Sequence, residues 1–189
     1  MSTESRRPIS VALAELDDLK ALLRFDLYCE RWEVCGSIRR RKPDVGDVDI
    51  CCIPKTILAS TSGDLFVAEP VQHVNALWAR VDDLVRLGSI AKAIKETASG
   101  PRTKWGEKSR AILFRNAVYE INCCDADNFG PWVAIRTGPA ELSHLFAKQL
   151  GAACRDGFHV YKHGLLVKGC TEAQFFDLAG LKYIPPEAR

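Results

Sequence analysis

The spacing of apolar residues predicts two helices in the first half of the chain. In residues 10–25 apolar side chains recur at the helical period, with charged side chains between them. The same period covers residues 71–87, and Gly88 follows the last apolar position as a helix-ending glycine would. Residues 55–70 between them carry Ser, Thr, Gly and Pro, which predicts a loop with at most a short edge strand.

Other segments have the patterns of strands. Residues 46–54, GDVDICCIP, alternate so that Asp47, Asp49 and Cys51 share one face and apolar side chains share the other. Residues 109–114 and 117–124 flank Arg115-Asn116, a pair suited to a tight hairpin turn. Further strands are expected at residues 32–35, 89–96 and 132–137, and short β pieces at 157–161 and 164–168.

Two more helices are expected near the end of the chain, over residues 140–153 and 171–180. The second begins with a capping box, Thr171 with Gln174, and Gly180 marks its end. The turn-rich stretch DADNFGP suggests a boundary between residues 1–127 and residues 128–189. The expected fold class is therefore α+β, with a mixed or antiparallel sheet and a small C-terminal α/β subdomain.

Composition and charge exclude some functional classes. The chain has 189 residues, is 47% apolar and carries a net charge of +2, so overall basicity does not indicate a nucleic-acid partner. Cations nevertheless gather in residues 39–42 and 92–115. The eight cysteines show no C-x-x-C spacing, and no run of eighteen apolar residues is present. We expect an intracellular, cytoplasmic monomer with reduced thiols and no membrane span.

Residues 34–54 contain most of the candidate metal-binding and phosphate-binding residues. Asp47 and Asp49 leave the same face of a strand, and two such close carboxylates favour Mg²⁺, which also binds substrate phosphates. Gly36 and Ser37 lie in a turn that can offer backbone N–H groups and a hydroxyl to phosphate oxygens. The arginines that follow this turn can reach the same phosphates. The pattern predicts a site for a metal ion and a phosphorylated substrate.

Four stretches together resemble one known family. GSIRRRKPDVGDVDI resembles the palm motif of the family X DNA polymerases, within the nucleotidyltransferase superfamily. RTGPAELSHLF resembles their Thr-Gly turn and the following helix, and GFHVYKHGLL their small C-terminal sheet. TEAQFFDLAGLKYIPPEAR resembles their terminal helix and its Pro-Pro-Glu-x-Arg close. The order is conserved from about residue 10 to the end, as in minimal phage-type and bacterial members without a lyase domain.

The resemblance implies roles for individual residues. Asp47 and Asp49 match two carboxylates that hold two Mg²⁺ ions, for which Mn²⁺ can substitute. Ser37 and Arg40, with the Gly36 turn, match the triphosphate-binding residues, and Arg39 matches a neighbouring arginine. The third metal-binding carboxylate falls on Glu120, where the family has aspartate, and the extra methylene moves the carboxylate. The implied nucleotide site also includes Ile135, Arg136, Thr137, Gly138 and Ser143.

Two departures from the family pattern affect the expected specificity. An aromatic pair that usually precedes the Thr-Gly turn is replaced by Ile135 and Arg136, so we expect weak discrimination against ribonucleotides. No lyase domain or helix-hairpin-helix module is expected, so other cations must contact DNA. The candidates for phosphate contacts are Lys104, Lys108 and Arg110.

The expected activity is addition of nucleotides to a DNA primer 3′-hydroxyl with release of pyrophosphate, as in gap-filling repair. One alternative is the same chemistry on an RNA 3′ end or on an acceptor that is not a nucleic acid. The other is a nucleic-acid-binding scaffold with little catalytic activity, to which only the glutamate at position 120 points. Template use and the preferred sugar of the nucleotide stay open at this point.

Overall fold

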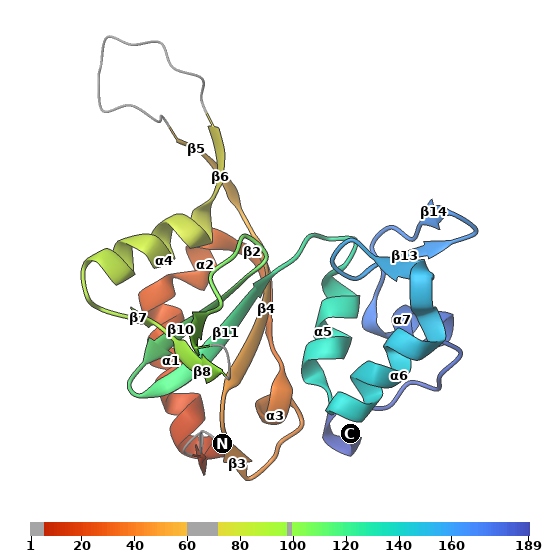
Figure 1. Ribbon diagram of the computed structural model, residues 1–189, viewed down its shortest axis with the longest axis horizontal. Helices are drawn as coiled ribbons and strands as arrows, with labels where there is room; N and C mark the ends of the chain where they lie inside the picture. Colours follow the sequence, from red (N-terminus) through yellow and green to blue (C-terminus); the bar gives the residue numbers. More distant parts are fainter. Residues whose placement is uncertain (1–5, 60–71, 98–99) are drawn as a thin grey trace.

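A five-stranded mixed sheet forms the centre of the N-terminal lobe in the computed structural model, which describes residues 6–59, 72–97 and 100–189 (Figure 1). The strand order is β2–β4–β11–β10–β7. The central pair, β4 (Val48–Pro54) and β11 (Ala117–Cys123), is parallel, whereas the other pairs are antiparallel. The remaining strands are β2 (Cys29–Val34), β10 (Ser109–Phe114) and β7 (Ala91–Lys92). This arrangement confirms an α+β fold with a mixed sheet.

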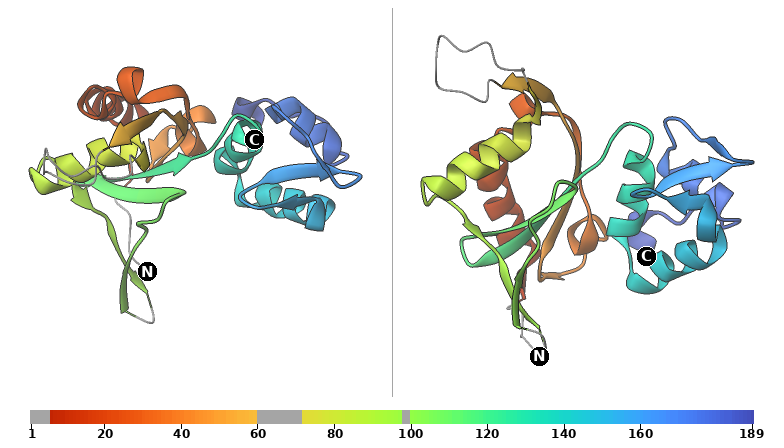
Figure 2. Two further views of the ribbon diagram at one scale, coloured as in Figure 1. Left: turned by 90° about the horizontal axis from the view of Figure 1, so that it is seen from above. Right: turned by 45° about the horizontal axis from the view of Figure 1, so that its top comes forward.

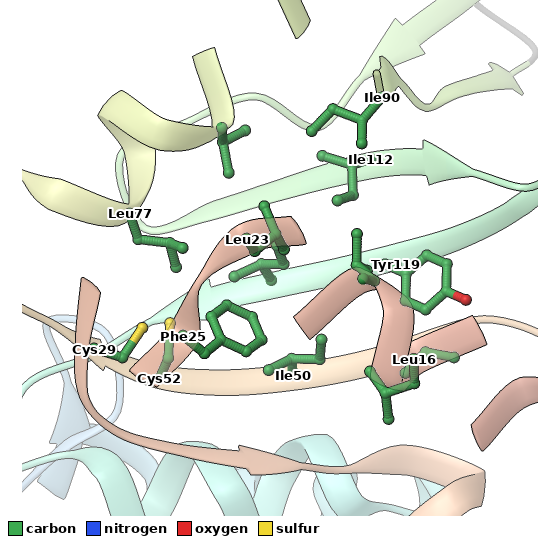
Figure 3. Close-up of a cluster of buried hydrophobic side chains, with 14 of the residues drawn as sticks. Leu16, Leu23, Phe25, Cys29, Ile50, Cys52, Leu77, Ile90, Ile112 and Tyr119 are labelled. Carbon is green, nitrogen blue, oxygen red and sulfur yellow. The ribbon is translucent and has the colours of Figure 1, made fainter. Parts of the chain in front are cut away.

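One face of this sheet is covered by α1 (Ile9–Leu23), α2 (Phe25–Tyr28) and α4 (Ala76–Arg86) (Figure 1). Figure 3 shows the core between them, where Leu16, Leu23 and Leu77 from the helices meet Ile50 and Tyr119 from the sheet. Each of these side chains is at most 2% exposed. Because strand residues alternate, the inward position of Ile50 turns its neighbour Asp49 to the opposite face of the sheet.

Short hairpins extend from this lobe. β5 (Thr56–Ala59) pairs with β6 (Gln72–Asn75), and β8 (Ile94–Thr97) with β9 (Gly100–Thr103). The β8–β9 hairpin projects from the sheet (Figure 2). β1 (Arg7–Pro8) pairs with β3 (Asp44–Val45). The predicted turn at Arg115-Asn116 is confirmed, because both residues have positive φ between β10 and β11.

Two predicted elements of this lobe have different bounds. The helix predicted for residues 71–87 begins only at Ala76, because the side chain of Asn75 accepts a hydrogen bond from the Trp78 amide and caps the helix. Residues 72–75 instead pair with β5, while residue 71 and positions 60–70 of the predicted loop lie outside the described residues. The single strand predicted for residues 89–96 is two short strands, β7 and β8, on different sheets.

The C-terminal lobe has its own core. Ala134, Phe146, Phe175 and Phe176 are at most 1% exposed, and the ring of Phe146 lies 4.6 and 4.8 Å from the two other phenylalanine rings. These residues come from α5 (Phe129–Thr137), α6 (Ala140–Leu150) and α7 (Glu172–Leu178). The helices pack with β12 (Cys154–Arg155), β13 (His159–Lys162) and β14 (Leu165–Leu166), and with 3₁₀ turns at Gly151–Ala153 and Pro186–Ala188. The predicted capping box of α7 is confirmed.

The strand predicted for residues 132–137 is wrong, because these residues form the greater part of helix α5. The β-branched residues in WVAIRT suggested a strand, but this apolar run is buried on most sides in a helix. Pro131 lies in the first helical turn, where its missing N–H is not needed. Gly130 lets α5 approach its neighbour closely, since a Cβ there would lie 2.3 Å from the Cys170 carbonyl oxygen.

The two lobes share a small buried cluster. Cys35 and Cys51 of the N-terminal lobe pack against Phe129, Trp132 and Val133 of α5. The predicted boundary at residue 127 lies in the segment that joins β11 to α5. All eight cysteines are free thiols. Within the described ranges, no helix is both long and apolar enough to cross a membrane.

Candidate active site

Two carboxylates meet on the central parallel strands. Asp49 on β4 and Glu120 on β11 are direct register partners, so their side chains lie next to each other on the face of the sheet opposite the core. Asp47 lies immediately before β4 and lines the same cleft as Asp49. The side chains of Asp49 and Glu120 are 16% and 24% exposed. Asp47 and Glu120, the other two carboxylates that the sequence analysis singled out, therefore each lie near Asp49.

The negative charge of this group is poorly compensated. The pKa of Asp49 is raised to about 7, chiefly by burial and then by the nearby Asp47 and Glu120 carboxylates, although Arg136 and Lys104 oppose the shift. A carboxyl group whose ionisation is this unfavourable gains from any added positive charge. The site is thus electrostatically suited to a divalent cation.

The turn before α3 (Gly36–Arg39) lies directly against Asp49. The amide of Cys35 donates a 2.8 Å hydrogen bond to the carbonyl oxygen of Asp49. Gly36 has a φ of +62°, and a Cβ at this position would lie 2.9 Å from Asp49 Oδ2. Glycine therefore serves both the left-handed backbone and the close approach of the carboxylate. Ser37 follows in the first turn of α3 and lines the cleft.

A cleft of about 670 Å³ opens between the lobes above these groups. Its walls include Asp47 and Asp49 on one side and the start of α6 on the other. The Arg40 guanidinium crosses the cleft and donates a hydrogen bond to the Thr137 carbonyl oxygen. Burial lowers the pKa of Arg40, while Asp49 acts in the opposite direction. A cation in this position can meet an anionic substrate.

Arg39 points away from the cleft. Its guanidinium donates two 2.8 Å hydrogen bonds to the carboxylate of Glu172 on α7 and a third to the hydroxyl of Thr137. Burial lowers the pKa of Arg39, but the paired Glu172 carboxylate more than reverses this, so the pKa is raised overall. With these donors engaged, the geometry favours a role for Arg39 in joining the lobes. Its assignment to nucleotide binding stays a prediction.

The end of α5 provides the predicted sugar-facing residues. Ile135 and Arg136 both line the cleft, together with Gly138 and Ser143. The Ser143 hydroxyl donates a 2.9 Å hydrogen bond to the Ile135 carbonyl oxygen and so ties α6 to α5. Thr137 is fully buried, and its hydroxyl and backbone carbonyl accept hydrogen bonds from Arg39 and Arg40 respectively.

The predicted DNA-binding cations lie in three different environments. Lys104 Nζ is 2.5 Å from Glu120 Oε2, inside the candidate site. Lys108 Nζ donates to the carbonyl oxygen of Asp156 across the two lobes, at 3.3 Å. Arg110 is 13% exposed and pairs with the carboxylate of Asp82 at 2.7 Å. It also stacks between two indole rings, those of Trp78 and Trp105. Their contact with DNA stays a prediction.

Two partners in this region were missed by the sequence analysis. Glu172 was read only as part of a helix start, although it anchors Arg39, and the acidic first turn of α7 is the sole signal for it. Lys104 was assigned to DNA rather than to Glu120. The β8–β9 hairpin and β10 bring Lys104 back over β11, and no sequence spacing indicates this contact.

The carboxylates are chemically suitable ligands for a metal ion, but they do not already form a complete coordination site. Asp47, Asp49 and Glu120 supply the hard oxygen donors that Mg²⁺ prefers, and the raised pKa of Asp49 indicates excess negative charge. Across residues 6–59, 72–97 and 100–189, however, no three Asp, Glu, His or Cys side chains are already gathered closely enough to hold a metal ion. Lys104 and Arg136 stand beside the carboxylates instead.

Comparison with known proteins adds no family to this description. No protein-family model matches the chain, and none of the curated proteins matches it.

Proposed function

We propose that this protein is a metal-dependent nucleotidyltransferase that adds nucleotides to the 3′-hydroxyl of a DNA primer, with a palm like that of the family X DNA polymerases. One observation carries the proposal: Asp49 and Glu120 are paired across adjacent parallel strands, and Asp49 lies against the Gly-Ser turn at the wall of an open cleft. Carboxylates beside a cleft of about 670 Å³ that Arg40 and Arg136 line suit phosphoryl transfer.

Different residues of the chain bind the substrate and the metal ions. Asp47, Asp49 and Glu120 would hold two Mg²⁺ ions, which when bound supply charge neutralisation and lower the pKa of the attacking hydroxyl. Ser37 and Arg40 bind the triphosphate, with Gly36 leaving room beside Asp49. The 3′-hydroxyl gives its proton to a site carboxylate or to water as its oxygen bonds to the α-phosphorus, the bond from the α-phosphorus to the bridging oxygen breaks, and pyrophosphate leaves. Positioning and electrostatics provide most of the rate enhancement.

The test is extension of a labelled primer. Single-stranded, templated and one-nucleotide-gapped DNA and an RNA primer are offered with each dNTP and rNTP, in Mg²⁺ and in Mn²⁺. The variant Asp49→Ala removes the central carboxylate, and Asp83→Ala, which removes an exposed carboxylate of α4, is the matched control.

Templated addition that is lost only in Asp49→Ala supports the proposal. Addition to RNA alone changes the acceptor, and transfer to no primer despite nucleotide binding indicates an acceptor that is not a nucleic acid. Absence of any metal-linked nucleotide binding contradicts the proposal and favours a scaffold without catalysis.

A further inference from the structure

Two cations from separate elements converge on the carboxylates of the candidate site. Lys104, which follows β9, places its Nζ 2.5 Å from Glu120 Oε2. Arg136, in the last turn of α5, places one guanidinium nitrogen 3.4 Å from the same oxygen and 3.9 Å from Asp49 Oδ1. One carboxylate oxygen of Glu120 therefore contacts a cation from each lobe.

The setting of Arg136 suggests that its guanidinium can exchange partners. Its side chain is 26% exposed and lines the cleft, so it has access to any molecule bound there. Its guanidinium carbon lies 5.3 Å from the centre of the Trp132 ring, a cation–π contact that uses none of its N–H donors. Its Nε is buried and has no hydrogen-bond partner among the described residues. The long distances to the two carboxylates indicate a loose ion pair rather than a bidentate one.

Nearby cations already offset part of the negative charge of the free site. Asp47, Asp49 and Glu120 carry three negative charges when ionised, and Arg40, Arg136 and Lys104 carry three positive charges. A divalent cation that binds Glu120 Oε2 must replace the cations that now contact this oxygen. A nucleoside triphosphate in the cleft offers the displaced Arg136 an alternative anion. Metal binding and nucleotide binding should therefore assist each other.

We propose that Arg136 and Lys104 are resident counter-ions of the carboxylates and compete with divalent metal, so that metal binds weakly until a nucleotide is present. This inference rests on the proposed function, because it takes these carboxylates to be the metal ligands. It makes Arg136 a positioning residue that couples the two ligands.

The test measures Mn²⁺ binding to the full chain by the electron paramagnetic resonance signal of free Mn²⁺. Titrations are made without nucleotide and with a deoxynucleoside triphosphate whose α,β-methylene bridge prevents transfer. The variants are Arg136→Gln, Lys104→Gln and the charge-preserving Arg136→Lys. Arg86→Gln, which removes an exposed arginine of α4, is the matched control. Asp49→Ala identifies the site at which Mn²⁺ binds.

In the absence of nucleotide, Arg136→Gln and Lys104→Gln are expected to bind Mn²⁺ roughly tenfold more tightly than the wild type, within the usual range of coupling between sites. The nucleotide-induced gain in Mn²⁺ affinity should shrink in Arg136→Gln and persist in Arg136→Lys and Arg86→Gln. Unchanged or weaker Mn²⁺ binding in both glutamine variants overturns the inference. If Asp49→Ala abolishes binding in that case, the proposed function stands. If Asp49→Ala leaves Mn²⁺ binding intact, both fail.

Discussion

Asp49 should lower the stability of the metal-free protein at neutral pH. The pKa of this carboxyl is raised from 3.8 to about 7, chiefly by burial and then by Asp47. Between these two values the folded protein retains a proton that the unfolded chain has lost. The free energy of unfolding therefore falls as pH rises from about 4 to about 7. The variant Asp49→Asn cannot ionise and should not show this loss.

The magnitude follows from the size of the pKa shift. A shift of about three units corresponds to about 4 kcal/mol, at 1.36 kcal/mol per unit. This is an upper bound, because the side chain is 16% exposed and water can relax the charge. We expect Asp49→Asn to be more stable than the wild type by about 2–4 kcal/mol at pH 8 in EDTA. At pH 4 the two proteins should be nearly equal in stability.

The measurement is urea-induced unfolding, followed by tryptophan fluorescence at several values of pH between 4 and 8. Asp83→Asn on the exposed surface of α4 is the control and should follow the wild type at each pH. The reasoning is refuted if the stability difference between Asp49→Asn and the wild type does not grow with pH. Such a result means that Asp49 ionises normally and that the site carries no excess negative charge.

Three further predictions concern the lobe contact, the Gly-Ser turn and the sugar. Glu172→Gln leaves Arg39 without its buried counter-ion and should cost about 3 kcal/mol in urea unfolding at pH 7. Burial raises the pKa of Glu172, but Arg39 lowers it, and overall the pKa lies below its ordinary value of 4.5. The stabilisation by the ion pair is therefore fully present above pH 4.5 and is lost as the pH falls through the lowered pKa. Glu172→Gln should not show this loss of stability in acid. Gly36→Ala should unfold at lower urea concentration and transfer nucleotides at least roughly tenfold more slowly, because the added methyl group would lie too close to the Asp49 carboxylate. Transfer at the wild-type rate would contradict the close approach of Gly36 to Asp49. If the cleft binds a nucleotide as proposed, Ile135 and Arg136 offer its sugar no aromatic ring, so matched ribo- and deoxyribonucleotides should show only weak discrimination in steady-state incorporation. A strong preference for deoxyribonucleotides would contradict this.

Local signals in the sequence predicted much of the N-terminal lobe. The alternation in residues 46–54 is strict enough to assign both the strand and the outward face of Asp49, and helix α1 follows from its apolar period. The capping box at Thr171 marks the start of α7 for a similar reason, because both of its hydrogen bonds are local. Such features depend on neighbours within a few residues.

Features that depend on contacts between residues far apart in the sequence were not predicted. The run of residues 132–137 fits a strand by composition, and only packing against both lobes makes it a helix. The pairs Arg39–Glu172 and Lys104–Glu120 join different elements, so no spacing along the chain reveals them. The outward face of Asp49 was predictable from the alternation of its own strand, whereas Glu120 was assigned through the family resemblance because no local pattern places it beside Asp49. The cations that neutralise them come from a hairpin and a helix end, which the sequence does not place.

The most direct test of the account is transfer of a single α-labelled dNTP to a templated primer by the wild type, Asp49→Asn and Asp83→Asn in Mg²⁺. The account predicts one-nucleotide extension by the wild type and Asp83→Asn, and no extension by Asp49→Asn although that variant is folded and more stable. Extension that persists in Asp49→Asn would contradict the assignment of catalysis to the carboxylates on β4 and β11.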